Sequence, residues 1–131
     1  MKLVILGKGN YKFIPDPNTE VWTVGTSNYE HADKYFEFHG VSVPHDNVVR
    51  TVPEKLRKSK LPLNCSICIM LAIACEYETF DEIVIKGCPM LERAEYIEQR
   101  PSLAYLVGYY QGKGINVIWE DLPKNKHYGV K

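Results

Sequence analysis

The sequence predicts an α/β protein built on an open, mostly parallel sheet of about five strands, with helices on both faces. Apolar runs that end in glycine, such as residues 2–7 and 20–25, are typical of strands buried on both faces, as parallel strands are. In the second half of the chain, strand-like and helix-like segments alternate. Parallel strands need crossover connections of this kind, so the sheet is expected to be Rossmann-like in the broad sense.

Each expected element follows from its local pattern. Residues 34–40 alternate aromatic and polar side chains, and residues 47–53 end at a proline, so both are weaker strand candidates. Residues 65–77 have the length and apolar content of a buried helix. A strand at residues 81–87, an amphipathic helix at residues 100–114 and a strand at residues 115–121 complete the expected fold.

Length and charge limit the classes of function. The 131 residues are expected to form one domain, residues 1–131, with a flexible tail at about residues 123–131. Sixteen basic and sixteen acidic residues cancel, so nucleic acid is not an expected partner. The apolar run at residues 3–6 is too short for a signal peptide or a membrane span, which predicts a cytoplasmic protein with reduced thiols.

A C-x-x-C pair, Cys65 and Cys68, opens the expected central helix. With Cys75, these residues fall at i, i+3 and i+10, which predicts one helix face packed on the sheet, where free cysteine acts as a small hydrophobe. The alternatives are half of a zinc site and a redox motif. Neither has a supporting sequence context, because further ligands and a directly preceding strand are missing. The sequence therefore predicts that Cys65 and Cys68 bind no metal and form no disulfide.

Two segments are expected to meet where a phosphate can bind. The turn after the first strand contains Gly7, Lys8, Gly9 and Asn10, and its glycines allow close backbone approach to a ligand. Asn64 or Ser66 is a plausible N-cap for the central helix, whose first backbone N–H groups and partial positive charge favour an anion. An ordinary strand-to-loop turn remains the alternative for the first segment.

Two further places carry candidate functional side chains. Glu37 and His39 lie two residues apart on an expected strand and hence on one side of it, where they suit a base and its orienting group. A solvent-exposed polar edge is the alternative. Arg100 is a candidate phosphate ligand, but it can equally tie down its loop through a carboxylate such as Glu95. Pro101 is expected near the start of the helix, where a missing donor is tolerated.

Residues 36–39 ("FEFH") and 95–101 ("EYIEQRP") are the most specific parts of a resemblance that extends over nearly the whole chain. In their order along the sequence, the segments resemble a family of small Rossmann-like proteins common in bacteriophage genomes. That family usually has a strand with tryptophan, F-E-x-H, a Ser/Thr-rich helix start, G-x-D-M, and Y-x-Q-R-P before the last helix. The resemblance places the protein in the host cytoplasm if a phage encodes it.

This family is in turn distantly similar to bacterial sialyltransferases that use a CMP-linked sugar and to archaeal pterin pyrophosphokinase-like proteins. The similarity implies a nucleotide site lined by Gly7, Gly9, Asn10, Ser27 or Asn28, Asn64 and Ser66. Two departures weaken its transfer to this chain. Gly25 stands where the family often has asparagine, and Pro89 replaces the aspartate of G-x-D-M.

The expected function is therefore a nucleotide or nucleotide-sugar binding protein, with transferase or hydrolase activity as a further possibility. The alternatives are a non-catalytic module that binds a nucleotide signal and a structural or interaction protein. A nucleotide-type small molecule is the expected partner, no membrane partner is expected, and a homo-oligomer is compatible with the sequence. The sequence identifies no cofactor.

Overall fold

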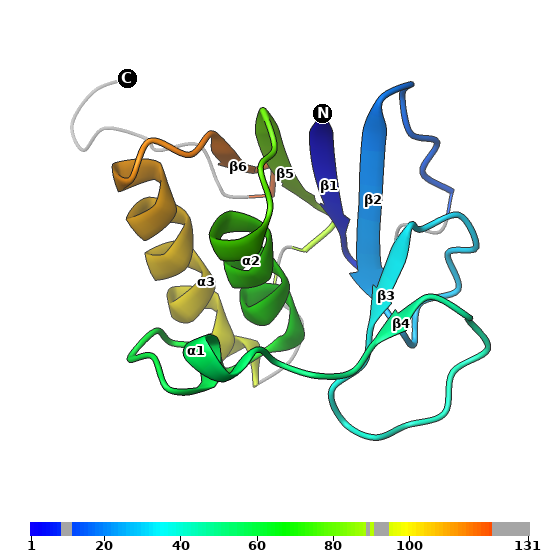
Figure 1. Ribbon diagram of the computed structural model, residues 1–131, viewed down its shortest axis with the longest axis horizontal. Coiled ribbons are helices and arrows are strands. Elements are labelled where there is room, and N and C mark those ends of the chain that lie inside the picture. The colour runs from blue at the N-terminus through cyan, green and yellow to red at the C-terminus, as the bar shows by residue number, and fades with distance from the viewer. Residues whose placement is uncertain (9–11, 89, 91–94, 122–131) are drawn as a thin grey trace.

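A computed structural model describes residues 1–8, 12–88, 90 and 95–121. Six strands form one sheet in the order β4-β3-β2-β1-β5-β6, and every neighbouring pair is parallel (Figure 1). The strands are β1 (Lys2–Leu6), β2 (Thr19–Val24), β3 (Lys34–Phe36), β4 (Val48–Val49), β5 (Glu82–Lys86) and β6 (Val117–Trp119). The helices are α1 (Glu54–Arg57), α2 (Ser66–Tyr77) and α3 (Tyr96–Gly112). The predicted α/β class and parallel sheet are confirmed, with six strands instead of about five.

The path of the chain creates a switch point between β1 and β5. From β1 the chain moves outward through β2 and β3 to β4, then returns through α1 and α2 to β5 on the other side of β1. The connection after β1 runs toward β4 and the connection after β5 runs toward β6, so the two connections diverge between β1 and β5. In open parallel sheets, the crevice beside the strands' carboxyl ends at such a point is the usual place for a ligand.

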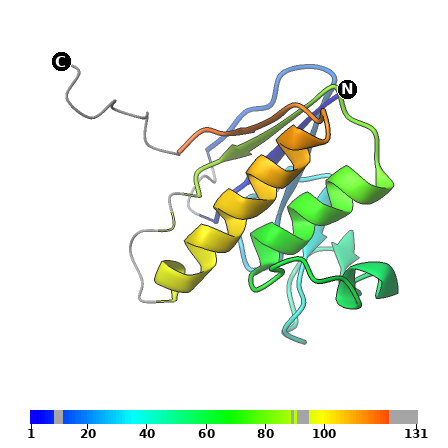
Figure 2. The same ribbon diagram turned by 90° about the vertical axis from the view of Figure 1, so that its left-hand side faces the viewer.

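The described helices gather on one face of the sheet instead of both (Figure 2). The larger core cluster joins α2 and α3 to Leu3, Ile5 and Trp22, whereas the smaller cluster on the other face is covered by loop residues such as Tyr29. Right-handed crossovers explain this difference. Because α2 and α3 both belong to connections that run from β4 toward β6, they fall on the same face.

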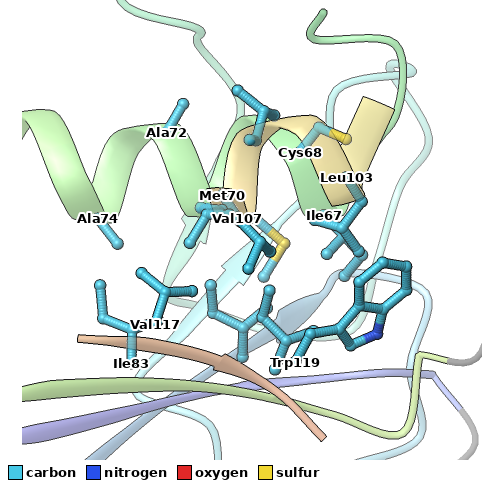
Figure 3. Packing of buried hydrophobic residues seen from close by; sticks show 14 of the residues in the cluster. Ile67, Cys68, Met70, Ala72, Ala74, Ile83, Leu103, Val107, Val117 and Trp119 are labelled. Carbon is cyan, nitrogen blue, oxygen red and sulfur yellow. The ribbon is translucent and has the colours of Figure 1, made fainter. Parts of the chain in front are cut away.

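The helical face holds most of the core. Residues of α2, including Ile67 and Met70, and of α3, including Leu103, pack above Ile83 and Trp119 of the sheet (Figure 3). α2 is apolar around nearly its whole circumference, as expected for a helix enclosed by a sheet and a second helix. Complete burial of each large apolar side chain contributes about 1.5–3 kcal/mol, so this layer holds the helix starts firmly against the strand ends.

Gly7, directly after β1, marks the closest approach of two chain segments at the switch point. Its N–H donates to the Lys86 carbonyl over 2.8 Å, and a Cβ built on it would lie 1.8 Å from the Gly87 carbonyl oxygen. No side chain fits there without moving the backbone of the β5 loop. The glycine therefore lets the loops after β1 and β5 pack directly against each other.

We expect Gly7→Ala to lower the free energy of unfolding by at least about 2 kcal/mol, because the new methyl group overlaps backbone atoms that a rotamer change cannot move. Urea denaturation at neutral pH measures this change.

Gly108→Ala in α3 is the matched control, because nothing lies within 4 Å of its added Cβ. This change should raise the free energy of unfolding by up to about 1 kcal/mol, since alanine loses less entropy in a helix than glycine does. Equal effects of the two substitutions would contradict the close approach at Gly7.

Candidate functional site

A cleft of about 1260 Å³ opens at the carboxyl ends of the strands. Residues that follow β1, β2, β3, β5 and β6 line it, together with the first turns of α2 and α3. It thus lies at the switch point between β1 and β5. The loops leaving the strands and the starts of two helices face the same space, which is the arrangement on which the sequence prediction of a ligand site depended.

The cleft brings together six of the predicted site residues and separates them from three others. Gly7, Lys8, Glu37, His39, Asn64 and Ser66 all line it. Gly9 and Asn10 lie outside the described residues, as do Pro89 and the predicted flexible tail at residues 123–131. Ser27, Asn28 and Arg100 are described but are not part of the lining.

The connection after β2 presents a different residue from those predicted. Ser27 is buried, and its hydroxyl oxygen accepts a hydrogen bond from the Tyr29 N–H over 3.1 Å, while Asn28 is exposed. Thr26 lines the cleft instead. Ser27 therefore shapes the loop, and the polar side chain that follows β2 into the cleft is one residue earlier than expected.

Arg100, which belongs to α3, packs on the aromatic ring of Trp119 in β6. Its guanidinium carbon lies 4.7 Å from the centre of the Trp119 ring, in the range of a cation–π contact. Trp119 is buried and donates its ring N–H to the Cys88 carbonyl over 2.9 Å. Pro101 lies inside α3, not near its start as the sequence suggested, because the helix already begins at Tyr96.

Glu37 is bound by the chain around it. β3 ends at Phe36, so Glu37 and His39 do not continue an exposed strand edge. The buried carboxylate accepts hydrogen bonds from the N–H groups of His39 (3.1 and 3.2 Å) and Val41 (2.9 Å) and pairs with Arg50 at 3.2 Å. Arg50 also donates to the Val41 carbonyl over 2.9 Å. The carboxylate thus organises the loop after β3.

The surroundings of Glu37 favour its ionised form. Burial alone would raise the pKa of this carboxyl, but the N–H groups of His39 and Val41 and the charges of His39 and Arg50 outweigh it and lower the pKa below its usual range. Such a group is a poor proton acceptor at neutral pH. Of the two predicted catalytic residues, the exposed His39 is the one whose side chain remains suited to proton transfer in the cleft.

Gly25 makes room for Glu37. A Cβ on Gly25 would lie 3.0 Å from Cβ and 3.2 Å from Cγ of Glu37, tighter than ordinary packing. A side chain at this position would therefore compete with the buried carboxylate for space, and the glycine leaves room for the inward position of Glu37.

The start of α2 differs from the predicted buried cysteine face. Cys65 is the N-cap of the helix, with an extended backbone, and is one of the residues that line the cleft. Its sulfur accepts from the Cys68 N–H over 3.5 Å and lies 3.2 Å from the Cys68 sulfur. Cys68 is fully buried in the core and Cys75 is half-buried. The C-x-x-C pair thus spans the boundary between the cleft and the core.

Most charged groups in the cleft are already compensated within the chain. Lys86 pairs with Glu120 at 2.7 Å, and the Asp121 carboxylate accepts from the Cys88 N–H over 2.7 Å. Lys8 is exposed at the rim and has no ion-pair partner among the residues that the structure describes. Lys86 is the last residue of β5, and Lys8, Cys88, Glu120 and Asp121 lie within two residues of a strand end. The rule that strand ends line the crevice therefore identifies these residues too, whereas the motifs in the sequence do not indicate Lys86, Cys88 or Asp121.

Within the described ranges, no three His, Cys, Asp or Glu side chains are arranged to hold a metal ion. None of the helices in this part of the chain combines the length and apolar character of a bilayer-spanning segment. Comparisons with protein-family models, curated proteins and solved structures find no match. The resemblance to phage Rossmann-like proteins, and through them to sialyltransferases, therefore stays a prediction.

We expect the stabilising effect of the Glu37 carboxylate to depend on pH. Because its folded-state pKa is lowered, this effect is fully present above the unfolded-state value of about 4.3 and is lost as the pH falls through the folded-state pKa. Glu37→Gln should therefore be less stable than the parent at pH 7, and the difference should shrink below about pH 4. Urea unfolding across this pH range measures it.

Glu30→Gln, which changes an exposed carboxylate in the β2–β3 connection, should leave the parent's pH profile unaltered. A difference between the parent and Glu37→Gln that stays constant from pH 7 to pH 3 would show that the Glu37 charge does not organise the loop.

Proposed function

We propose that the protein binds a nucleotide or nucleotide-sugar in the cleft, with the phosphate next to the start of α2. The observation that carries this proposal is the position of the cleft, at the carboxyl ends of parallel strands beside the β1–β5 switch point. Its volume of about 1260 Å³ has room for a nucleotide-sized molecule.

The start of α2 supplies the polar groups for the phosphate. The first intrahelical hydrogen bond runs from the Ile69 N–H to the Cys65 carbonyl at 3.1 Å, so the N–H of Ser66 precedes the helical ladder. Ser66 is itself one of the residues that line the cleft. Asn64 lies beside it, with its amide nitrogen 3.4 Å from the Glu98 carbonyl, a contact that links the entry of α2 to α3.

The charges in the cleft are compatible with an anion. Glu37, Glu120 and Asp121 are each engaged with a cation or a backbone N–H, which reduces their repulsion of a phosphate. Lys8 stands at the rim on the loop after β1. The electrostatic effects of the helix start and of Lys8 extend only over short distances in salt solution. A chain with no net charge can therefore still offer a local anion site.

Binding without catalysis is better supported than a transferase or hydrolase reaction. The carboxylate of Glu37 is committed to the loop that contains His39 and Val41, so it positions the loop instead of moving a proton. A reaction in this cleft would rely on His39 as its acid–base group. If His39→Gln retained ligand affinity but abolished a measured turnover, the enzymatic form of this proposal would gain support.

We expect thermal unfolding of the parent protein to shift upward with at least one member of a panel of nucleotides and nucleotide-sugars, because a ligand of the native state raises its melting temperature. Ser66→Asp should weaken that ligand's binding at least about tenfold, since a carboxylate at the helix start repels phosphate. Isothermal titration measures the affinity, and the variant should stay folded because an acidic group suits this helix position.

Ser66→Asn is the matched control: it adds a side chain of nearly the same shape without the charge, so its affinity should remain within about threefold of the parent's. If no member of the panel raises the melting temperature, or if the Asp and Asn variants lose affinity equally, the proposed phosphate site is wrong.

A further inference from the structure

The two cysteines at the start of α2 form a pair with unequal surroundings. Cys65 is half-buried and lines the cleft, whereas Cys68 is fully buried in the core behind it. Their sulfur atoms are 3.2 Å apart, close to contact. A disulfide requires the two sulfurs to approach to about 2.05 Å, a short movement from this position. The pair therefore has one sulfur that a cleft ligand can reach and a second sulfur directly behind it.

The surroundings of Cys65 lower the pKa of its thiol. The hydrogen bond with the Cys68 side chain lowers the pKa of the Cys65 thiol most, and the N–H groups of Cys68 and Ile67 lower it further against the opposing effect of burial. For Cys68, the same side-chain hydrogen bond, together with burial, raises the pKa. The two thiols thus differ in acidity, because the pKa of Cys65, at the cleft, is lowered and that of the buried Cys68 is raised.

The other two cysteines lack this arrangement. Burial raises the pKa of the Cys75 thiol to about 12, and Cys75 lies two turns further along α2. Burial also raises the pKa of Cys88 to about 12, although this residue lines the cleft. Cys75 and Cys88 therefore serve as internal comparisons for the reactivity of Cys65.

We propose that Cys65 and Cys68 form a redox-active dithiol that exchanges with a low-molecular-weight disulfide bound in the cleft. The concave site favours a small molecule over a protein disulfide, because Cys65 lies in the wall of a cleft and not on a protruding surface. This proposal does not depend on the nucleotide proposal. The two share the cleft but use different atoms and different tests.

The exchange balances without any further oxidant. The Cys65 thiolate attacks one sulfur of the substrate R–S–S–R, forms a Cys65–S–R bond and releases one thiolate, which takes up a proton. Cys68 then loses its proton, and its sulfur attacks Cys65 Sγ, which forms the Cys65–Cys68 disulfide and releases the second thiol. The protein dithiol loses two electrons and the substrate disulfide gains them. Excess R–SH reverses both steps.

Reduced protein mixed with oxidised glutathione at neutral pH tests this assignment. Mass spectrometry of the parent should find an intramolecular Cys65–Cys68 disulfide. Cys68→Ser should accumulate glutathione on Cys65, because the resolving sulfur is gone, and Cys65→Ser should form neither product. Initial modification of Cys65 should be at least about tenfold faster than that of Cys75, since the thiolate is the attacking species.

Cys75→Ser is the control and should behave like the parent, because Cys75 is not part of the cleft lining. If Cys68→Ser does not fold, as judged by its thermal unfolding, Cys68→Ala provides the same trap with an apolar side chain. Glutathione found first on Cys75 or Cys88, or on Cys65 of the parent without progress to the Cys65–Cys68 disulfide, would overturn the proposal. Reduction of insulin disulfides without reaction with glutathione would overturn the small-molecule assignment.

Discussion

The contact between Gly7 and Gly87 is the constraint on which the cleft depends. These residues follow the two strands that flank the switch point, and the space between them admits no Cβ on Gly7. Because the loops after β1 and β5 meet here, they line the same cleft as the starts of α2 and α3.

A second constraint closes the cleft on the β3 side. Gly25 leaves the space that the side chain of Glu37 occupies, and Glu37 in turn gathers the His39 and Val41 N–H groups and Arg50. The charge of this carboxylate therefore holds the conformation of the loop after β3. The same F-E-x-H letters would fit an acid–base pair on a straight strand, but the strand ends at Phe36 and the loop turns the carboxylate inward.

The sequence predicts the sheet well because apolar runs such as residues 2–7 and 20–25 reflect only the burial of each strand on both faces. The position of the cleft then follows from the parallel arrangement of the strands. It predicts the site less well. The pairing of Glu37 with Arg50 depends on a contact between different loops, and the four-residue helix α1 has too little periodicity to detect. α2 begins one residue later than expected, so Cys65 is an N-cap residue at the cleft and not a side chain of the core.

One helix start serves both proposals, and this links them energetically. The N–H groups of Ile67 and Cys68 at the beginning of α2 lower the pKa of the Cys65 thiol, so a thiolate at Cys65 would occupy them. A phosphate next to Ser66 would meet that thiolate as a like charge. Formation of the proposed Cys65–Cys68 disulfide would remove that charge, so oxidation and anion binding would favour each other, and by linkage a bound phosphate would favour the oxidised pair to the same degree. If both proposals hold, the anion affinity of the cleft depends on the redox state of this pair.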